Sequence, residues 1–138
     1  MHYLRRMATD KNAPRRMDGL PSLASARAAL DAADALAPED AVAALAAARV
    51  QLDAALDEAM AQALLAGRSL RSVAADAGVA PNTVPPRVAR TAALGSYRGP
   101  DDRVSAEGVT RARYDVEQGK HVSAAPDTTT PLRFRRRT

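Results

Sequence analysis

The sequence predicts a mostly α-helical protein, and three observations lead to this fold class. First, alanine dominates the 46% hydrophobic fraction of the 138 residues, while aromatic residues make up only 3%; alanine is the strongest helix former. Second, apolar residues recur at three- and four-residue spacing, as one face of a helix requires. Third, serine, glycine and proline stand at the ends of these periodic segments, where they start and stop helices.

Composition excludes several classes of protein. The chain has no cysteine, which rules out disulfide frameworks, thiolate metal sites and cysteine nucleophiles. No stretch approaches the roughly 18 apolar residues of a membrane-spanning helix. No apolar secretory signal opens the chain, so a cytoplasmic protein is predicted. The two histidines, His2 and His121, have no partners at metal-binding spacing, and no serine has a histidine partner. We therefore expect no metal, no cofactor and no enzymatic activity.

Charge and composition divide the chain into four segments. The net charge is +4, but it is unevenly spread. Residues 1–19 are expected to form a disordered basic arm, and 120–138 a disordered basic tail rich in threonine and proline. Residues 20–66 carry seven acidic and two basic side chains and have strong helical periodicity. Residues 67–119 are again basic and contain the turn signals of a small domain.

The acidic segment is predicted to form a helical hairpin. Ser22 is a suitable N-cap for a first helix over about 23–37, which stops before Pro38. Pro38 suits the first turn of a second helix over about 39–66, and Gly67 is a natural residue to end it.

The second helix carries an apolar seam with alternating steps of three and four residues. The seam consists of Val42, Leu45, Arg49, Leu52, Leu56, Ala59 and Ala63. Such a seam packs against a neighbouring helix at a shallow angle. One partner is the first helix folded back, and another is the same helix of a second subunit. Both hold at once in a four-helix homodimer, which is favoured because an alanine-rich core buries little apolar area.

Residues 69–88, with the sequence SLRSVAADAGVAPNTVPPRV, contain the most informative pattern. An apolar helical face precedes Gly78, which permits a left-handed turn, and two valines four residues apart follow. The pattern resembles the helix-turn-helix of bacterial transcription regulators of the lac-repressor headpiece type. The resemblance rests on Ala74, Ala77, Gly78, Val79, Thr83 and Val84. It implies a DNA-binding domain over 67–119 whose second helix enters the major groove.

Two prolines depart from that family pattern. Pro85 and Pro86 fall where the family continues its recognition helix, and proline inside a helix costs about 3 kcal/mol. We therefore expect the helix to begin later, with Thr83 or Val84 as its cap and both prolines in its first turn, where no backbone donor is needed. The recognition helix is then predicted over about 85–94.

On this interpretation, eight side chains are expected to contact DNA. Arg87 and Arg90 lie on one face of the recognition helix, and arginine suits guanine edges and phosphates. Asn82 and Thr83 stand at its N-terminal edge. Ser69 and Arg71 begin the preceding helix, whose N-terminus favours phosphate. For each single arginine, the alternative is a solvated surface charge.

The remaining two DNA-contacting residues belong to a predicted wing. Residues 95–104, GSYRGPDDRV, contain strong turn chemistry between two short expected strands. A final helix is predicted over about 106–118. The order of elements resembles winged regulators of the MerR and excisionase families, and it implies that Arg98 and Arg103 flank the wing turn and contact DNA. An ordinary surface loop is the alternative.

These observations predict a sequence-specific double-stranded DNA-binding protein, located at the nucleoid in the cytoplasm. Its role would be that of a transcriptional regulator or an accessory protein of a mobile element. A scarcity of aromatic residues argues against binding of single strands. Two alternatives stay open. In one, the seam makes the protein a helical interaction module; in the other, the basic ends coat nucleic acid without specificity.

Overall fold

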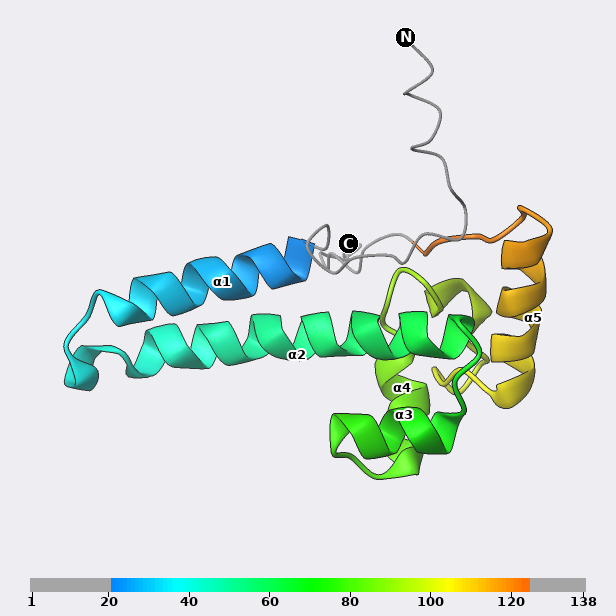
Figure 1. The fold of residues 1–138 in the computed structure, drawn as a ribbon, viewed down its shortest axis with the longest axis horizontal. Helices are drawn as coiled ribbons and strands as arrows, with labels where there is room; N and C mark the ends of the chain where they lie inside the picture. Colours follow the sequence, from blue (N-terminus) through cyan, green and yellow to red (C-terminus); the bar gives the residue numbers. More distant parts are fainter. Residues whose placement is uncertain (1–20, 125–138) are drawn as a thin grey trace, which may run out of the picture.

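The computed structural model describes residues 21–124, and this part of the chain is mostly helical, as predicted (Figure 1). Its elements are α1 (Pro21–Asp34), α2 (Val42–Leu65), α3 (Leu70–Ala77), α4 (Val84–Val88) and α5 (Ala106–Glu117), with short 3-10 turns η3 (Pro38–Asp40), η4 (Pro81–Thr83) and η5 (Gly95–Tyr97). No helix within this range has both the length and the apolarity to cross a membrane. The predicted arm 1–19 and residues 125–138 of the predicted tail lie outside the described residues.

The predicted hairpin is present, with α1 folded back antiparallel along the N-terminal half of α2 (Figure 1). The helix α2 begins at Val42 instead of near residue 39, because Pro38–Asp40 form a separate 3-10 turn. The contact between the two helices is made by alanines. They are Ala26 and Ala33 of α1, Ala41 just before α2, and Ala48 and Ala55 of α2, all buried. These small residues recur every seven positions, which allows the two helix axes to approach closely.

The apolar seam of α2 divides into two parts. Towards the C-terminal end of the helix, Leu56 and Ala63 pack against the main core. Towards the N-terminal end, Val42, Leu45 and Leu52 are exposed, because the alanines occupy the contact with α1. The seam therefore does pack at its C-terminal end, but against the main core, and it is not the surface that contacts α1.

The main core lies around the C-terminal half of α2, where α3, α4 and α5 gather (Figure 1). Its largest fully buried side chains are Leu64, Val84, Val88, Leu94 and Val104. Four of these residues come from the region after Gly78, so the segment that carries the expected DNA-binding residues is fixed by the core.

The predicted two-stranded wing is wrong, since the described residues contain no strand. Residues 95–97 form a 3-10 turn, and a tight turn follows in which the amide of Gly99 donates to the carbonyl of Arg103 at 2.9 Å. The physical reason is packing. Tyr97 is buried, and a Cβ on Gly108 of α5 would lie 2.8 Å from the Tyr97 carbonyl oxygen. The segment thus lies tightly against α5 and does not project as a hairpin.

Residues 120–124, the beginning of the predicted tail, pack against the core. The His121 ring stacks on Tyr97 with centroids 5.5 Å apart, and its Nε2 lies 2.7 Å from the carbonyl oxygen of Ala93. The amide of Ala124 donates to the carbonyl of Ala92 at 2.9 Å. The sequence pattern therefore places the start of the tail too early.

The phenol of Tyr97 provides a test of this packing. Its hydroxyl donates to Asp115 at 2.7 Å and accepts the amide of Val122 at 3.2 Å. Burial raises the pKa of Tyr97 above its usual 10.0, so the folded state disfavours tyrosinate. The stability that this group contributes is complete below pH 10 and falls as the pH rises above it. In an absorbance titration, we expect a late ionisation step above the usual range of tyrosine, and Tyr97→Phe to remove that step.

The matched control for this titration is Tyr114→Phe, because Tyr114 is exposed on α5. It should leave the late step in place. A late step that persists in the Tyr97→Phe variant would contradict the burial of this side chain.

Candidate nucleic-acid interface

The first helix of the predicted helix-turn-helix is closed at both ends as its sequence indicates. The Ser69 hydroxyl accepts the amide of Ser72 at 3.0 Å and caps the N-terminus of α3. Gly78 ends the helix in the left-handed conformation, with φ of 73°. The amide of Val79 then donates back to the carbonyl of Ala74 at 3.0 Å, which is the bond that closes a glycine-terminated helix.

The chain enters α4 through η4. The Thr83 hydroxyl donates to the carbonyl of Ala80 at 2.7 Å, and this bond holds the turn. The helix begins at Val84, with Thr83 at the cap position and Pro85 and Pro86 in its first turn. The late start that the two prolines predict is therefore observed.

The predicted extension of α4 to residue 94 is wrong, because the helix ends at Val88. The reason is a set of side-chain bonds that replace the helical ladder. The Thr91 hydroxyl donates to the carbonyl of Val88 at 2.6 Å and accepts the amide of Leu94 at 3.2 Å. A carboxylate oxygen of Glu58, on α2, accepts the amide of Ala92 at 3.0 Å.

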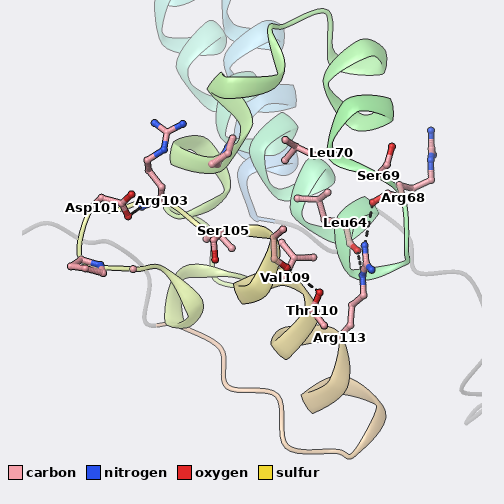
Figure 2. A pocket seen from close by; sticks show the side chains of 15 residues that line it. Leu64, Arg68, Ser69, Leu70, Asp101, Arg103, Ser105, Val109, Thr110 and Arg113 are labelled. Atoms are coloured by element: carbon pink, nitrogen blue, oxygen red, sulfur yellow. Dashed lines mark hydrogen bonds between the residues drawn. The ribbon is translucent and has the colours of Figure 1, made fainter.

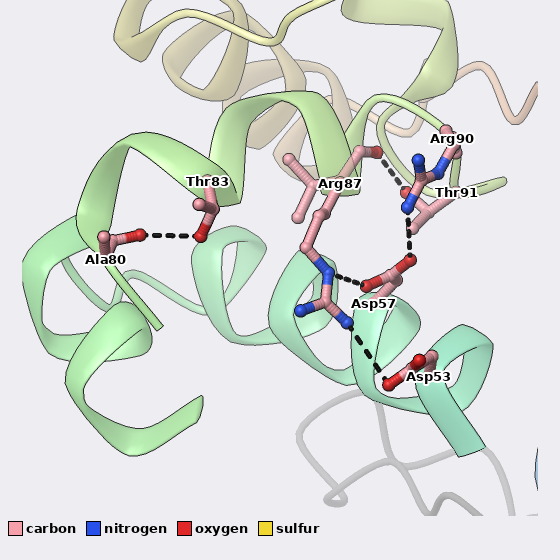
Figure 3. A network of polar contacts seen from close by, with 8 residues as sticks. Asp53, Asp57, Ala80, Thr83, Arg87, Arg90 and Thr91 are labelled. Atoms are coloured by element: carbon pink, nitrogen blue, oxygen red, sulfur yellow. Dashed lines mark hydrogen bonds and ion pairs between the residues drawn. The ribbon is translucent and has the colours of Figure 1, made fainter. Parts of the chain in front are cut away.

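The two arginines expected to read DNA from α4 are paired with carboxylates of α2 (Figure 3). Arg87 Nε lies 2.6 Å from Asp57 Oδ1, and Arg87 Nη2 lies 3.9 Å from Asp53 Oδ1. Arg90 Nη2 lies 3.3 Å from Asp57 Oδ2. The Asp57 side chain is 9% exposed and that of Arg87 only 21%. Arg87 therefore fixes α4 to α2, while most of the Arg90 side chain stays exposed.

A second group of predicted residues meets beside η4. Arg103 Nη2 donates to the carbonyl of Asn82 at 2.9 Å, and the Arg103 amide donates to Asp101 Oδ1 at 3.2 Å. The side chains of Asn82 and Thr83 are exposed. Although the wing is absent, its expected residue Arg103 thus lies next to the beginning of α4.

The remaining predicted residues lie apart from this group. Arg98 pairs with Asp102 at 3.6 Å and donates to the carbonyl of Ala89 at 3.4 Å. Arg71 is exposed on the first turn of α3. No ion pair is recorded for Arg71 or Arg103 within residues 21–124.

A cavity of about 620 Å³ lies between the N-termini of α3 and α5 and the turn at 99–103 (Figure 2). Two predicted residues, Ser69 and Arg103, line it. Its apolar lining includes Leu64, Leu70, Val104 and Val109. The Ser105 hydroxyl, also in the lining, accepts the amide of Gly108 at 3.1 Å and caps α5.

Sequence reasoning missed two further arginines in the lining of this cavity. Arg68 pairs with Asp76 across the exposed face of α3. Arg113 reaches from α5 to the carbonyl of Leu64, with Nε at 2.8 Å. The position of Arg68 just before the Ser69 cap was the available signal, whereas nothing local in the sequence marks Arg113. Together with Arg103 they outnumber the one aspartate of the lining, Asp101, so the surface favours anions.

No family model, curated protein or solved structure matches this chain. Among the described residues, no cluster of histidine, aspartate and glutamate side chains could hold a metal ion. The function must therefore be argued from the geometry above.

Proposed function

We propose that this protein binds double-stranded DNA sequence-specifically, with the corner formed by α3, η4 and α4 turned towards the duplex. The observation that carries the proposal is the exposed pair Asn82 and Thr83 at the start of α4. In a helix-turn-helix, the residues that open the second helix contact base edges. Asparagine is suited to adenine, to which it can make two hydrogen bonds in the major groove.

Basic side chains beside this edge support the proposal. Arg71 and Arg103 have no recorded ion pair within the described part of the chain. Guanidinium groups in such a position bind backbone phosphates, which fix the register of a protein on the duplex. Ser69, at the N-terminus of α3, adds free backbone donors on the same side as the cavity arginines.

The ion pairs with Asp57 change the roles expected for Arg87 and Arg90. Asp57 would repel DNA if it were unpaired, and Arg87 and Arg90 neutralise it. We assign Arg87 as a positioning residue that holds α4, and we keep Arg90, whose side chain is mostly exposed, as a phosphate contact. A protein of this kind would regulate transcription or serve a mobile element.

The test is duplex binding by the full chain, measured by fluorescence anisotropy across a salt series. The region upstream of its own gene would be compared with a scrambled duplex of equal length. A preference that persists at physiological salt supports the proposal. Equal, steeply salt-dependent binding to both duplexes would overturn sequence specificity and favour coating by the basic ends. Absence of binding would overturn the proposal itself.

Two variants separate the contributions of charge and base contact. Arg71→Ala with Arg103→Ala should weaken binding to both duplexes by on the order of tenfold, because phosphate contacts carry no sequence information. Asn82→Ala should instead reduce the preference for the specific duplex by on the order of tenfold. The carbonyl of Asn82 that accepts from Arg103 is unchanged by this substitution.

Lys120→Ala, which removes one positive charge away from the corner, is the control for charge alone, since Lys120 is exposed beyond the C-terminal end of α5. Its binding should resemble that of the wild type. An equal loss in this variant would mean that only net charge matters, and an unchanged preference in Asn82→Ala would remove that residue from the reading edge.

The second candidate function is a helical interaction module, and the exposed leucines of the hairpin favour it. It predicts a folded protein with no affinity for either duplex. The two functions are compatible in one chain, because the hairpin leucines and the α3–α4 corner are separate surfaces.

A further inference from the structure

The hairpin exposes large apolar side chains although its helices are fully formed. Leu30 of α1 is 49% exposed, and Leu45 and Leu52 of α2 are 50% and 53% exposed. We call these three residues the leucine stripe. Single exposed leucines are ordinary, but an aligned set of them on one surface marks an interaction site.

The three leucines share one register relative to the buried alanines. Leu30 follows Ala26 by four positions and precedes Ala33 by three. Leu45 and Leu52 stand in the same relation to the buried alanines Ala41, just before α2, and Ala48 and Ala55, within it. Residues four apart lie close to one another on a helix face, rotated slightly in the same sense.

The helices α1 and α2 run antiparallel (Figure 1). Each leucine is rotated from the alanine contact of its helix by the same angle and in the same sense along the chain. In two antiparallel helices, this rotation turns both sets of leucines to one side of the hairpin. The leucine stripe is therefore one continuous surface that spans both helices. Val42, 71% exposed, extends the stripe along α2.

Charges of both signs border this surface. Arg27 and Asp34 of α1 each follow a buried alanine by one position, as Arg49 of α2 does. An interface between two identical surfaces must be complementary to itself, and the arginines of one copy can face the aspartate of the other across a two-fold axis.

The size of the surface also suits a second copy. The exposed parts of the leucine stripe and Val42 amount to on the order of 400 Å² of apolar surface, which is the scale of functional patches on monomers. Two copies, with the stems of the bordering charged residues, approach the ~1,200 Å² of the smallest stable interfaces.

We propose that a second copy of this chain docks on the leucine stripe, so that two hairpins form a four-helix homodimer. Each copy would cover the leucines of the other, and the α3–α4 corners would be held at a fixed separation. The dimer itself is independent of the proposed DNA binding. Only the pairing of two DNA half-sites rests on that function.

The test is the mass of the full chain in solution by light scattering after gel filtration. The wild type should have twice the 14.5 kDa of one chain. The variant with Leu45→Asp and Leu52→Asp should have the mass of one chain and unchanged helix content by circular dichroism, because neither side chain contributes to the core of the monomer.

The matched control is Val50→Asp, on the same helix. Val50 is 64% exposed, and it lies two residues beyond Ala48, on the opposite side of α2 from the stripe. This variant should remain dimeric. A wild type that is monomeric at about 100 µM, a stripe variant of unchanged mass, or a monomeric Val50→Asp variant would each overturn the proposal.

A chemical measurement identifies what covers the leucine stripe. The chain has no cysteine, so Leu52→Cys introduces a single thiol whose rate of alkylation can be followed. The thiol should be protected at high protein concentration and become reactive on dilution, whereas that of Val50→Cys should react rapidly throughout. Protection that does not change on dilution, in a monomeric protein, would show that another part of the same chain covers the stripe and would overturn the dimer.

DNA binding by the stripe variant separates the two proposals. A monomeric variant that still prefers a single half-site, but has lost about tenfold or more in affinity for a two-site duplex, supports both proposals. If the wild type is dimeric and binds no DNA, the dimer stands while the proposed function fails.

Discussion

Replacing Asp57 by alanine will lower the free energy of unfolding by about 3 kcal/mol, because it leaves Arg87 partly buried without its carboxylate partner. The pair joins residues 30 positions apart and fixes α4 to α2. Urea denaturation followed by circular dichroism measures this loss. DNA binding should weaken in the same variant, since α4 loses its attachment.

The neighbouring aspartate supplies the control. Asp53 lies 3.9 Å from the same arginine but is mostly exposed, so Asp53→Ala should cost less than about 0.5 kcal/mol. The double variant Asp57→Ala with Arg87→Ala should lose less than the sum of the two single variants. Equal losses for Asp53→Ala and Asp57→Ala would show that burial does not distinguish the two pairs.

Leu94→Ala should destabilise the protein by about 3 kcal/mol, the usual cost of emptying a fully buried leucine site. Leu94 lies in the irregular segment between α4 and η5, yet it is among the largest fully buried side chains. Its removal opens a cavity beside Val84 and Val88, which support the candidate interface. Thermal and urea denaturation of the variant would measure the effect.

Leu36→Ala is the corresponding control, because Leu36 is exposed in the loop after α1. It should change the free energy of unfolding by less than about 1 kcal/mol. A similar loss in both variants would contradict the assignment of the core to the region around the C-terminal half of α2.

Local signals in the sequence predicted local structure well. The start of α3 at Ser69, the left-handed Gly78 and the placement of Pro85 in the first turn of α4 all depend on contacts within a few residues. The hairpin was also predicted, because its two helices are adjacent in the chain and a proline marks the turn between them. Such features follow from backbone geometry and hydrogen bonding between near neighbours.

The features that were missed depend on residues far apart in the sequence. Nothing near Arg87 indicates that Asp57 lies opposite it, and nothing near His121 indicates that Tyr97 stacks on it. Residues 99–102 do form the predicted turn, but a turn does not require paired strands. The burial of Tyr97 holds the preceding segment against the core, so that no hairpin forms. Likewise, periodicity located the seam of α2 without revealing that alanines would occupy the contact with α1.

The alanine contact of the hairpin sets opposite limits on substitution in the two halves of this protein. At Ala33 or Ala48, buried where two helix backbones come close, glycine or serine leaves the separation unchanged, while any larger side chain forces the helices apart. At Leu64 or Leu94 the reverse holds, because only a large side chain fills the site. As the sequence changes in evolution, the hairpin contact should therefore keep small side chains and the main core should keep large ones. The two halves of the protein can then differ in composition while the fold stays the same.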